Sequence, residues 1–474
     1  MKLLQRKTKV IWSLSSSRLE DSLSANLQEK DIGALSLLYA PSAHAETLAF
    51  LEKQGAHTPT SNEQKDIPLL LDFGSHPVVT LTSLPEPRTV TAGEEIHLVR
   101  QTPAREDEIQ VDCEEWDLFF VAGGQIYLGD GSVVLSIVKA EKERVKAKVL
   151  HEGLLRAGEQ LHNLDFFTSH QNLFLSTLST LPLDAVDYLI LPATLEVAQI
   201  QEIQTQLEKY GAQAPWILLR IASQESFQHL ETSLPWVKGV VISRLHLALT
   251  GNAASVPILT KRITQLCNEH AKIVIVACEM LASMRDKPTP TRAEVSDIAN
   301  AVIDGVDAVT LAEELIAGAY EDRALQVCNL IIEDLEEQEE IQINWRKKEL
   351  PILNVLDAVS LHSYQTALRV KAKAIICITQ QGNTALRLAS FRPHIPILAV
   401  TFCQSIKRKL SLIRGVTAVS LDGSPNLDTV LPSMQILLRE DKRFVSGDKI
   451  VFVSVSISSM GTESSNLFTV QEIE

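Results

Sequence analysis

PTPTRAEVSDIANAVIDGVD, residues 288–307, combines a loop, a helix and the approach to a strand. Two prolines keep the chain ahead of Thr291 out of helical geometry. Thr291 and Glu294 have the spacing of a capping box, in which each side chain accepts a hydrogen bond from the other residue's backbone amide. Apolar residues then recur at helical spacing until Gly305, a residue that commonly ends a helix. The stretch therefore predicts one helix packed on a core, followed by a buried strand over residues 307–311.

The composition is that of a soluble globular chain with an acidic surface. Of its 474 residues, 45% are hydrophobic and 22% are charged, and the formal net charge is -15. The length predicts about two to four domains, and the negative charge argues against binding to nucleic acids or anionic membranes. The six cysteines are scattered without a CxxC pair, which indicates reduced thiols. Because we find no membrane-spanning apolar run and no signal-peptide pattern, we expect a cytoplasmic protein.

The order of the predicted elements divides the chain into four segments. Short apolar runs alternate with helical patterns over residues 1–85, which is typical of parallel β/α structure. Short strands separated by turn signals fill residues 86–166 and predict an all-β insertion. Alternation returns over residues 167–345, and a final segment over residues 346–474 has a βαβ pattern. The strands expected in the third segment are residues 187–191, 216–221, 239–243, 272–277 and 307–311.

Residues 288–307 and the motif DAV that overlaps their end are similar to the sequence after the seventh barrel strand of the pyruvate kinase family. The later motifs Arg392-Pro393, Ala399-Val400-Thr401, Arg414-Gly415-Val416 and Gly447-Asp448 resemble that family's C-terminal regulatory domain. The resemblance spans the chain and is strongest from about residue 270 onward. It implies an α/β fold: a (β/α)8 TIM barrel with an inserted small all-β lid domain and a C-terminal α/β domain.

The resemblance also implies a reaction, the transfer of phosphate from phosphoenolpyruvate to ADP in the last step of glycolysis. That reaction needs a divalent metal, a cation on the phosphoryl group and a proton source for the enolate. Where the family has two metal-binding carboxylates, this sequence has Ala222 and His246. Arg220 stands where the family has the lysine that stabilises the phosphoryl group. Cys278 stands where the family has the threonine linked to protonation of the enolate.

The positions that steer phosphate and hold a monovalent cation are replaced as well. Ser36 stands where the family has the arginine that steers phosphate. Leu38 and Ala40 stand where the family has two residues whose side-chain oxygens bind K⁺. The residues that match substrate- or nucleotide-binding positions are Asp72, Asp130 and Arg244. One remaining carboxylate cannot enclose K⁺ alone. We therefore expect this chain to have the family's fold without its phosphoryl-transfer activity, and to bind no cofactor. Mg²⁺ and K⁺ would be needed only if activity is retained.

Several replacements leave an enzymatic role open. His246 could bind a transition metal, although a histidine at a strand end is also compatible with a solvated side chain. Cys278 could act as a nucleophile beside a base, or lie buried as an inert thiol. Glu279 and Glu314 could rebuild a magnesium site from new positions. The enzymatic alternative is residual pyruvate kinase activity or another phosphoryl or enolate reaction.

A non-catalytic role requires partners or ligands. In the family, the helix after Thr291 and the C-terminal domain face neighbouring subunits, so we expect a homo-oligomer (dimer or tetramer) or a hetero-oligomer with an active pyruvate kinase. A loop before a predicted helix resembles the family's site for the phosphate of a small-molecule effector, where backbone amides converge. The residues of this predicted effector site are Thr379, Gly382, Asn383 and Thr384, with Gly461 and Thr462 opposite. The alternative is a plain strand-to-helix turn capped by Thr384.

Overall fold

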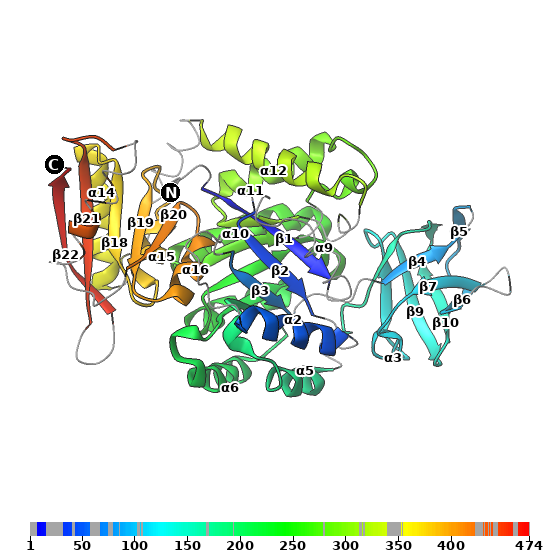
Figure 1. Ribbon diagram of the computed structural model, residues 1–474. Helices are drawn as coiled ribbons and strands as arrows, with labels where there is room; N and C mark the ends of the chain where they lie inside the picture. Colours follow the sequence, from blue (N-terminus) through cyan, green and yellow to red (C-terminus); the bar gives the residue numbers. More distant parts are fainter. Residues whose placement is uncertain are drawn as a thin grey trace.

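In the computed structural model of this chain, the described residues are 7–15, 32–39, 43–56, 67–73, 79–84, 86–101, 105, 108–166, 170–192, 194–277, 280–311, 315, 318–338, 352, 354–421, 430, 432–434, 436, 438, 444–457 and 463–473. They form three bodies (Figure 1): a parallel barrel in the middle, a small all-β domain at one end and an α/β domain at the other. The predicted fold class is confirmed.

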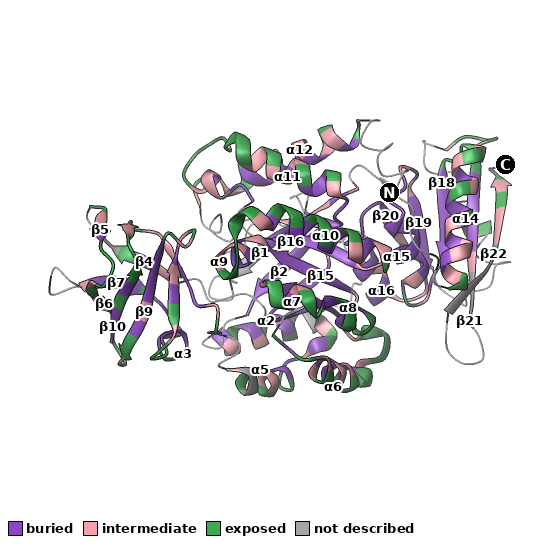
Figure 2. Ribbon diagram, turned by 180° about the vertical axis from the view of Figure 1, so that it is seen from behind, coloured by how far each residue is buried: buried purple, intermediate pink, exposed green. Residues whose placement is uncertain are grey.

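The central body is a closed barrel of eight parallel strands in the order β1-β17-β16-β15-β14-β13-β3-β2. Its strands are β1 (Lys9–Ser15), β2 (Ala34–Leu38), β3 (Leu69–Asp72), β13 (Tyr188–Pro192), β14 (Trp216–Ile221), β15 (Gly239–Ser243), β16 (Ile273–Ala277) and β17 (Ala308–Thr310). The helices outside it are α2 (His44–Ala56), α5 (Gln171–Leu178), α6 (Val197–Leu207), α7 (Gln224–Gln228), α8 (Leu230–Ser233), α9 (Arg244–Thr250), α10 (Val256–Glu269), α11 (Arg292–Asp304) and α12 (Glu321–Glu336). The strands are buried and the outer helix faces exposed (Figure 2), as expected for a barrel whose strands are continuous apolar runs.

The predicted helix over the opening stretch is α11, and its capping box is present. The Thr291 hydroxyl accepts from the Glu294 amide at 3.3 Å, and the Glu294 carboxylate accepts from the Thr291 amide at 2.7 Å. Gly305 ends the helix in the left-handed conformation, with φ of 86°. Glu294 also accepts from the amide and hydroxyl of Ser283 at 2.7 and 2.6 Å. One carboxylate therefore orders both the start of α11 and the loop after β16.

The insertion is a second closed barrel, β10-β6-β7-β4-β12-β8-β9, with β11 and β5 as a separate pair. Its elements are β4 (Val79–Ser83), β5 (Arg88–Val90), β6 (Glu95–Val99), β7 (Glu108–Asp112), α3 (Trp116–Phe119), β8 (Gln125–Leu128), β9 (Val133–Ala140), β10 (Arg144–His151), β11 (Gly153–Leu155) and β12 (Gln160–His162). It begins at β4, upstream of the expected boundary at residue 86, because Val79 and Leu81 fill the lid's own core and β4 pairs with β7 and β12.

The C-terminal domain is a five-stranded sheet in the order β20-β19-β18-β21-β22. Its elements are α14 (Val355–Val370), β18 (Ala374–Ile378), α15 (Asn383–Ser390), β19 (Ile397–Thr401), α16 (Gln404–Ser411), β20 (Val416–Ser420), β21 (Lys449–Ile457) and β22 (Glu463–Glu472). Four strands run parallel, and β22 pairs antiparallel with β21 at the edge. The parallel part confirms the predicted βαβ pattern. Among the described residues, no helix is both long and apolar enough to cross a membrane.

Buried charges fix the C-terminal domain to the floor of the barrel. Asp307, just before β17, accepts two hydrogen bonds from Arg392 at 2.7 and 3.0 Å. The same carboxylate accepts from the backbone amides of Val274 and Arg414 at 2.9 and 3.2 Å. Asp307, Arg392 and Arg414 are all buried. A buried ion pair needs such additional hydrogen bonds to offset the desolvation of its charges, so this junction depends on both domains.

A second buried contact brings the start of the chain to the same junction. The Thr8 hydroxyl donates to Glu336 of α12 at 2.8 Å and accepts from Arg414 Nε at 3.2 Å. Arg414 Nη2 lies 3.2 Å from Glu336 Oε1. Thr8, Glu336 and Arg414, which are distant in sequence, therefore form one buried hydrogen-bonded cluster at the end of the barrel opposite its mouth.

Candidate active site at the barrel mouth

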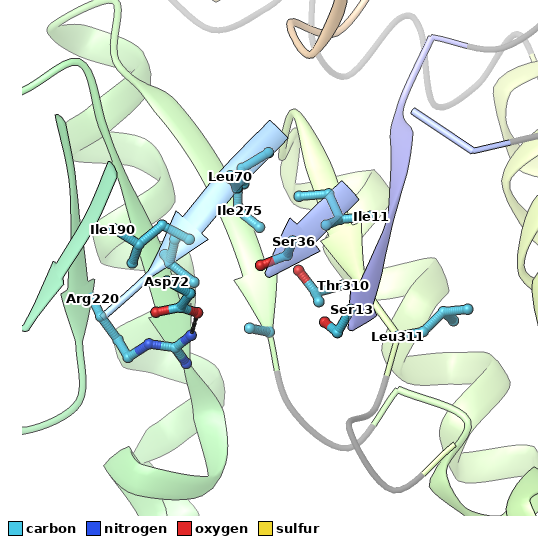
Figure 3. A pocket seen from close by; sticks show the side chains of 12 residues that line it. Ile11, Ser13, Ser36, Leu70, Asp72, Ile190, Arg220, Ile275, Thr310 and Leu311 are labelled. Carbon is cyan, nitrogen blue, oxygen red and sulfur yellow. Dashed lines mark hydrogen bonds and ion pairs between the residues drawn. The ribbon is translucent and has the colours of Figure 1, made fainter. Parts of the chain in front are cut away.

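A small cavity lined by both apolar and polar side chains lies among the carboxyl ends of the barrel strands. It is lined by Ile11, Ser13, Ser36, Leu70, Asp72, Ile190, Arg220, Val241, Ile275, Ala277, Thr310 and Leu311. Figure 3 shows Asp72 and Arg220 on one side and the hydroxyls of Ser13, Ser36 and Thr310 on the other. Barrel enzymes carry their chemistry at these strand ends, which makes this cavity the candidate active site.

Arg220 and Asp72, both predicted as site residues, form a buried ion pair with each other. Arg220 Nη2 donates to Asp72 Oδ2, and the two residues are 3% and 1% exposed. The residues come from β14 and β3, which are separated by β13 in the barrel. The arginine therefore lies across the mouth instead of projecting out of it. The Arg220 guanidinium is therefore paired with Asp72, the one carboxylate that remains at the position of the family's K⁺ site.

The cavity beside the ion pair is very small. Its volume is about 10 Å³, room for roughly one water molecule, whereas pockets for metabolites measure roughly 300–1,000 Å³. Ser13 Oγ is buried there and has no hydrogen-bond partner among the residues that the structure describes. The described side chains that line this cavity therefore leave little space between them.

His246, at a position where the family has a metal-binding aspartate, contacts the lid. Its Nδ1 lies 2.5 Å from the hydroxyl of Ser243, the residue before α9. Its ring meets the ring of His162, at the end of lid strand β12, edge to face with centroids 5.9 Å apart. Both histidines are buried. His246 thus forms part of the contact between barrel and lid, a role that its position in the sequence does not reveal.

Arg244 is directed toward helix α11 and not into the cavity. Its Nη1 lies 3.1 Å from Asp297 Oδ2, and its Nη2 lies 3.7 Å from Met280 Sδ. At the other predicted metal position, Ala222 contributes only a backbone carbonyl, which accepts from the Thr250 hydroxyl at 3.0 Å. Apart from the pair of Arg220 and Asp72, the predicted residues around the mouth therefore do not converge on one point.

The donor set at the mouth does not fit a divalent magnesium site. Mg²⁺ requires an octahedron of oxygen ligands, while Ala222 has no side-chain oxygen and His246 offers nitrogen. In the described parts of the chain, no three His, Cys, Asp or Glu side chains gather in an arrangement that could hold a metal. Cys278, Glu279 and Glu314 lie outside the described residues. The described residues of the mouth therefore offer no ligand set for Mg²⁺.

Asp130, predicted from the family's lid turn, caps the tight turn between β8 and β9. Its carboxylate accepts from the Ser132 amide at 3.0 Å. Gly131 in this turn has φ of 86°, and a Cβ atom on it would lie 2.5 Å from Leu249 Cδ2 of α9. The turn is thus packed closely on the barrel, which places the lid against α9.

Acidification is expected to destabilise the contact between the lid and the barrel, because His162 is buried there. Burial lowers the pKa of His162 from 6.5 to about 4, and the residue is 7% exposed. Since the folded pKa lies below the unfolded value, the unfolded chain binds more protons between these pH values. The contribution to stability is therefore present above pH 6.5 and is lost as the pH falls to about 4, by at most roughly 3 kcal/mol.

Unfolding in urea at pH 7 and pH 4.5 measures this effect. His162→Phe, which keeps a ring against His246, should reduce the loss of unfolding free energy on acidification. The exposed His151 on β10 offers a matched control, since His151→Phe should leave that loss unchanged. An identical pH dependence in the wild-type protein and His162→Phe would contradict the assignment.

The predicted effector loop lies against the barrel. The Thr379 hydroxyl accepts from the Gly382 amide at 2.9 Å, and Asn383 Oδ1 accepts from Lys238 Nζ at 2.8 Å. A Cβ atom on Gly382 would lie 2.6 Å from the Trp216 ring. Thr379 and Thr384 are fully buried, while Gly461 and Thr462 lie outside the described residues. The effector role of this loop stays a prediction.

Three residues of the mouth were not singled out from the sequence: Ser13, Thr310 and His162. Ser13 and Thr310 lie toward the ends of predicted barrel strands, so their place at the mouth could have been derived from the strand assignment. His162 gives no such signal, because its neighbour His246 belongs to another domain.

Comparison with known proteins identifies the family. Residues 5–325 match the model for the pyruvate kinase barrel domain, and residues 357–471 match the model for the pyruvate kinase alpha/beta domain. The pyruvate kinase of Bacillus licheniformis is 28% identical over 474 aligned residues, covering 96% of this chain and 79% of that protein. That of Staphylococcus haemolyticus is 26% identical over 460 residues, covering 95% and 78%.

Solved structures show the same fold. The crystal structure of Cryptosporidium parvum pyruvate kinase has a TM-score of 0.72 and 22% sequence identity, covering 100% of this chain and 98% of that one. The same enzyme in complex with ADP has a TM-score of 0.71 and 21% identity, covering 100% and 97%. On the match of both domains to the family models, this chain belongs to the pyruvate kinase family.

Proposed function

We propose that this member of the family does not transfer phosphate from phosphoenolpyruvate to ADP, and that it acts as an oligomer partner or a metabolite-responsive regulatory protein in the cytoplasm. The observation that carries the proposal is the buried pair of Arg220 and Asp72. The cation placed to stabilise a phosphoryl group is neutralised by a carboxylate of the same chain. Ala222 and His246 provide no carboxylates for a divalent ion that would neutralise transition-state charge, an effect worth several kcal/mol.

A coupled assay for pyruvate formation, with Mg²⁺ and K⁺ present, tests this proposal. Because each 1.4 kcal/mol of lost transition-state stabilisation is about tenfold in rate, we expect a turnover number below about 1 s⁻¹. A higher turnover number in the purified wild-type protein contradicts the proposal. A sharper version introduces Ala222→Glu and His246→Asp together, which should restore Mn²⁺ binding. The uncharged pair Ala222→Gln and His246→Asn is the matched control and should not bind Mn²⁺.

The second candidate function is residual pyruvate kinase activity. It is favoured by Arg220, which keeps a positive charge at the phosphoryl position although its planar fork differs from an ammonium. This function would need Mg²⁺ and K⁺, with ligands supplied by residues outside the described mouth. The same assay distinguishes the two candidates.

Association through helices α11 and α12 is the part of the proposal that concerns partners. The two helices pack on each other, and their outer faces carry Ile303 and Leu330, which are 38% and 57% exposed. Arg292 and Asn300 are exposed on the same pair of helices. Exposed apolar side chains on two helices that pack on each other are compatible with an interaction site. The supported partner is a second copy of this chain or an active pyruvate kinase.

Light scattering tests the association. We expect a dimer or tetramer at micromolar concentration, and Leu330→Lys should shift the equilibrium toward the 52.4 kDa monomer. Ile258 of α10 is similarly exposed on another helix, so Ile258→Lys is the matched control and should leave association unchanged. A monomer both alone and after mixing with an active pyruvate kinase would refute this part of the proposal.

A further inference from the structure

A pocket on the outside of the barrel lies between helices α5 and α6, which stand side by side in Figures 1 and 2. Two short 3-10 helices, η3 (Leu183–Ala185) before β13 and η4 (Glu208–Gln213) before β14, complete its walls. The volume of the pocket is about 280 Å³, which is far larger than the cavity at the barrel mouth. Pockets for metabolites measure roughly 300–1,000 Å³, so this one has room for a small molecule.

The buried side chains that line this outer pocket are all apolar. Leu178, Leu183, Ile203 and Leu207 are 2–5% exposed and belong to the main core of the barrel. Tyr210, which is partly buried, packs against the same core and also lines the pocket. Apolar surface that water can reach gains free energy when an apolar group covers it. The interior of the pocket therefore favours the ring or hydrocarbon part of a ligand.

The exposed side chains that line the outer pocket are polar: Ser179, Gln206 and Lys209. The Lys209 ammonium lies 4.8 Å from the centre of the Tyr210 ring, a cation–π contact that holds the charge beside the pocket. Among the described residues, no carboxylate forms an ion pair with Lys209. Of the described residues that line the pocket, Lys209 is also the only charged one. The edge of the pocket therefore offers an ammonium group to an anion.

From this arrangement we propose that the outer pocket binds a small carboxylate that carries one aromatic ring. The ring lies against the buried aliphatic side chains and the ring of Tyr210, and the carboxylate accepts from Lys209 Nζ. Aromatic rings gain additional free energy from offset or edge-to-face contacts with each other, which favours a ring over an aliphatic chain beside Tyr210. The volume of about 280 Å³ limits the ligand to about one ring.

Helix η4 connects the outer pocket to the C-terminal domain. Lys209 and Tyr210 of η4 line the pocket, while the carbonyls of Ala212 and Ala214, at and just after its end, accept from Lys409 Nζ at 3.0 and 2.7 Å. Lys409 belongs to α16 and is fully buried, and a buried ammonium needs such acceptors. A ligand that contacts Lys209 and Tyr210 should therefore also order the segment that α16 contacts.

Titration of the full chain with phenylacetate, followed by calorimetry at constant ionic strength, tests the proposal. Phenylacetate has about ten non-hydrogen atoms, and a ligand of that size that fits its pocket reaches a dissociation constant of about 1 mM or below. Phenylacetamide keeps the shape without the charge, and acetate keeps the charge without the ring. Both should bind at least about threefold more weakly. Bound phenylacetate should slow hydrogen exchange over residues 203–214.

Lys209→Met keeps the apolar stem of the lysine and removes its charge. We expect this variant to bind phenylacetate at least about threefold more weakly and to lose the preference for phenylacetate over phenylacetamide. Lys209→Arg keeps the charge and should retain that preference. Lys142 of the lid is also exposed, so Lys142→Met is the matched control and should bind phenylacetate as the wild-type protein does. Lys209 is on the surface, so these variants should fold.

Four results would overturn the proposal. They are no saturable binding of phenylacetate at about 10 mM, equal binding of phenylacetamide, unchanged binding by Lys209→Met, and protection from exchange only outside residues 203–214. The proposal goes beyond the proposed function, because the assay follows the binding of phenylacetate and needs neither turnover nor association. Its failure would leave the loss of phosphoryl transfer and the oligomeric state to their own tests.

Discussion

The Asp307→Ala variant is expected to lose about 3–5 kcal/mol of unfolding free energy, because it leaves the buried guanidinium of Arg392 without its carboxylate partner. Arg392 would lose both of its hydrogen bonds to this carboxylate and keep Asn268 Oδ1, at 2.5 Å, as a side-chain partner. The backbone amides of Val274 and Arg414 would lose their acceptor as well. Since these groups come from both domains, the C-terminal domain should melt at a lower temperature than the barrel in the variant.

Differential scanning calorimetry and urea unfolding followed by tryptophan fluorescence measure this loss. Asp304→Ala is the matched control, three residues earlier in the chain. The Asp304 carboxylate, on a side chain that is 13% exposed, pairs at 2.5 Å with Lys261, whose side chain is 54% exposed. Ion pairs with a solvent-exposed partner contribute about 0–1 kcal/mol. Similar losses in the two variants would show that burial at the domain junction does not determine the contribution of Asp307.

The second large effect is expected at Gly382, where a side chain meets both backbone strain and a collision. Gly382 has φ of 86°, and a Cβ atom would lie 2.6 Å from the Trp216 ring. A non-glycine residue in this conformation costs about 1–3 kcal/mol, and overpacking adds about 1–3 kcal/mol. Gly382→Ala should therefore lower the unfolding free energy by about 2–6 kcal/mol and disturb the contact between barrel and C-terminal domain.

Gly415→Ala separates the two causes. Gly415 also has a positive φ, 72°, but nothing lies within 4 Å of its added Cβ atom. Gly415→Ala should therefore lose only the unfolding free energy that is due to backbone strain. Equal destabilisation of the two variants, measured by urea unfolding, would mean that Trp216 moves aside without cost and that the collision is not what restricts residue 382 to glycine.

The fold was largely predictable where local sequence determines local structure. Strands 216–221 and 239–243 are apolar runs with clear ends, and their bounds agree with β14 and β15 residue for residue. The capping box of α11 was equally clear, because all of its groups lie within four residues. Strand β22, by contrast, was not predicted. It lies at a sheet edge with Leu467 and Val470 exposed, so its sequence lacks the apolar run of a buried strand and depends on β21 for its hydrogen bonds.

The candidate site was predictable by residue but not by arrangement. Asp72 and Arg220 were both expected at the mouth, yet their pairing depends on the reach of one side chain across β13, which no local pattern contains. The contact of His246 with His162 depends on how the lid sits on the barrel. Likewise, the amides of the predicted effector loop were recognisable from glycine and threonine, whereas the packing of Gly382 on Trp216 requires knowledge of the domain contact.

The contact of Thr8 with Arg414 also sets the order in which this chain can fold during synthesis. β1 closes the barrel by pairing with β17. The hydroxyl of Thr8, just before β1, accepts a hydrogen bond from Arg414, which lies 406 residues further along the chain. Roughly 100 residues separate the end of β17 from Arg414, and a ribosome that adds about 5–20 residues per second needs about 5–20 s to supply them. Within this interval the Asp307 carboxylate lacks its partner until Arg392 is made, and the Glu336 carboxylate lacks its partner until Arg414 is made. Chains released before residue 414 should therefore be recognised by chaperones and proteases and should not accumulate as free barrels.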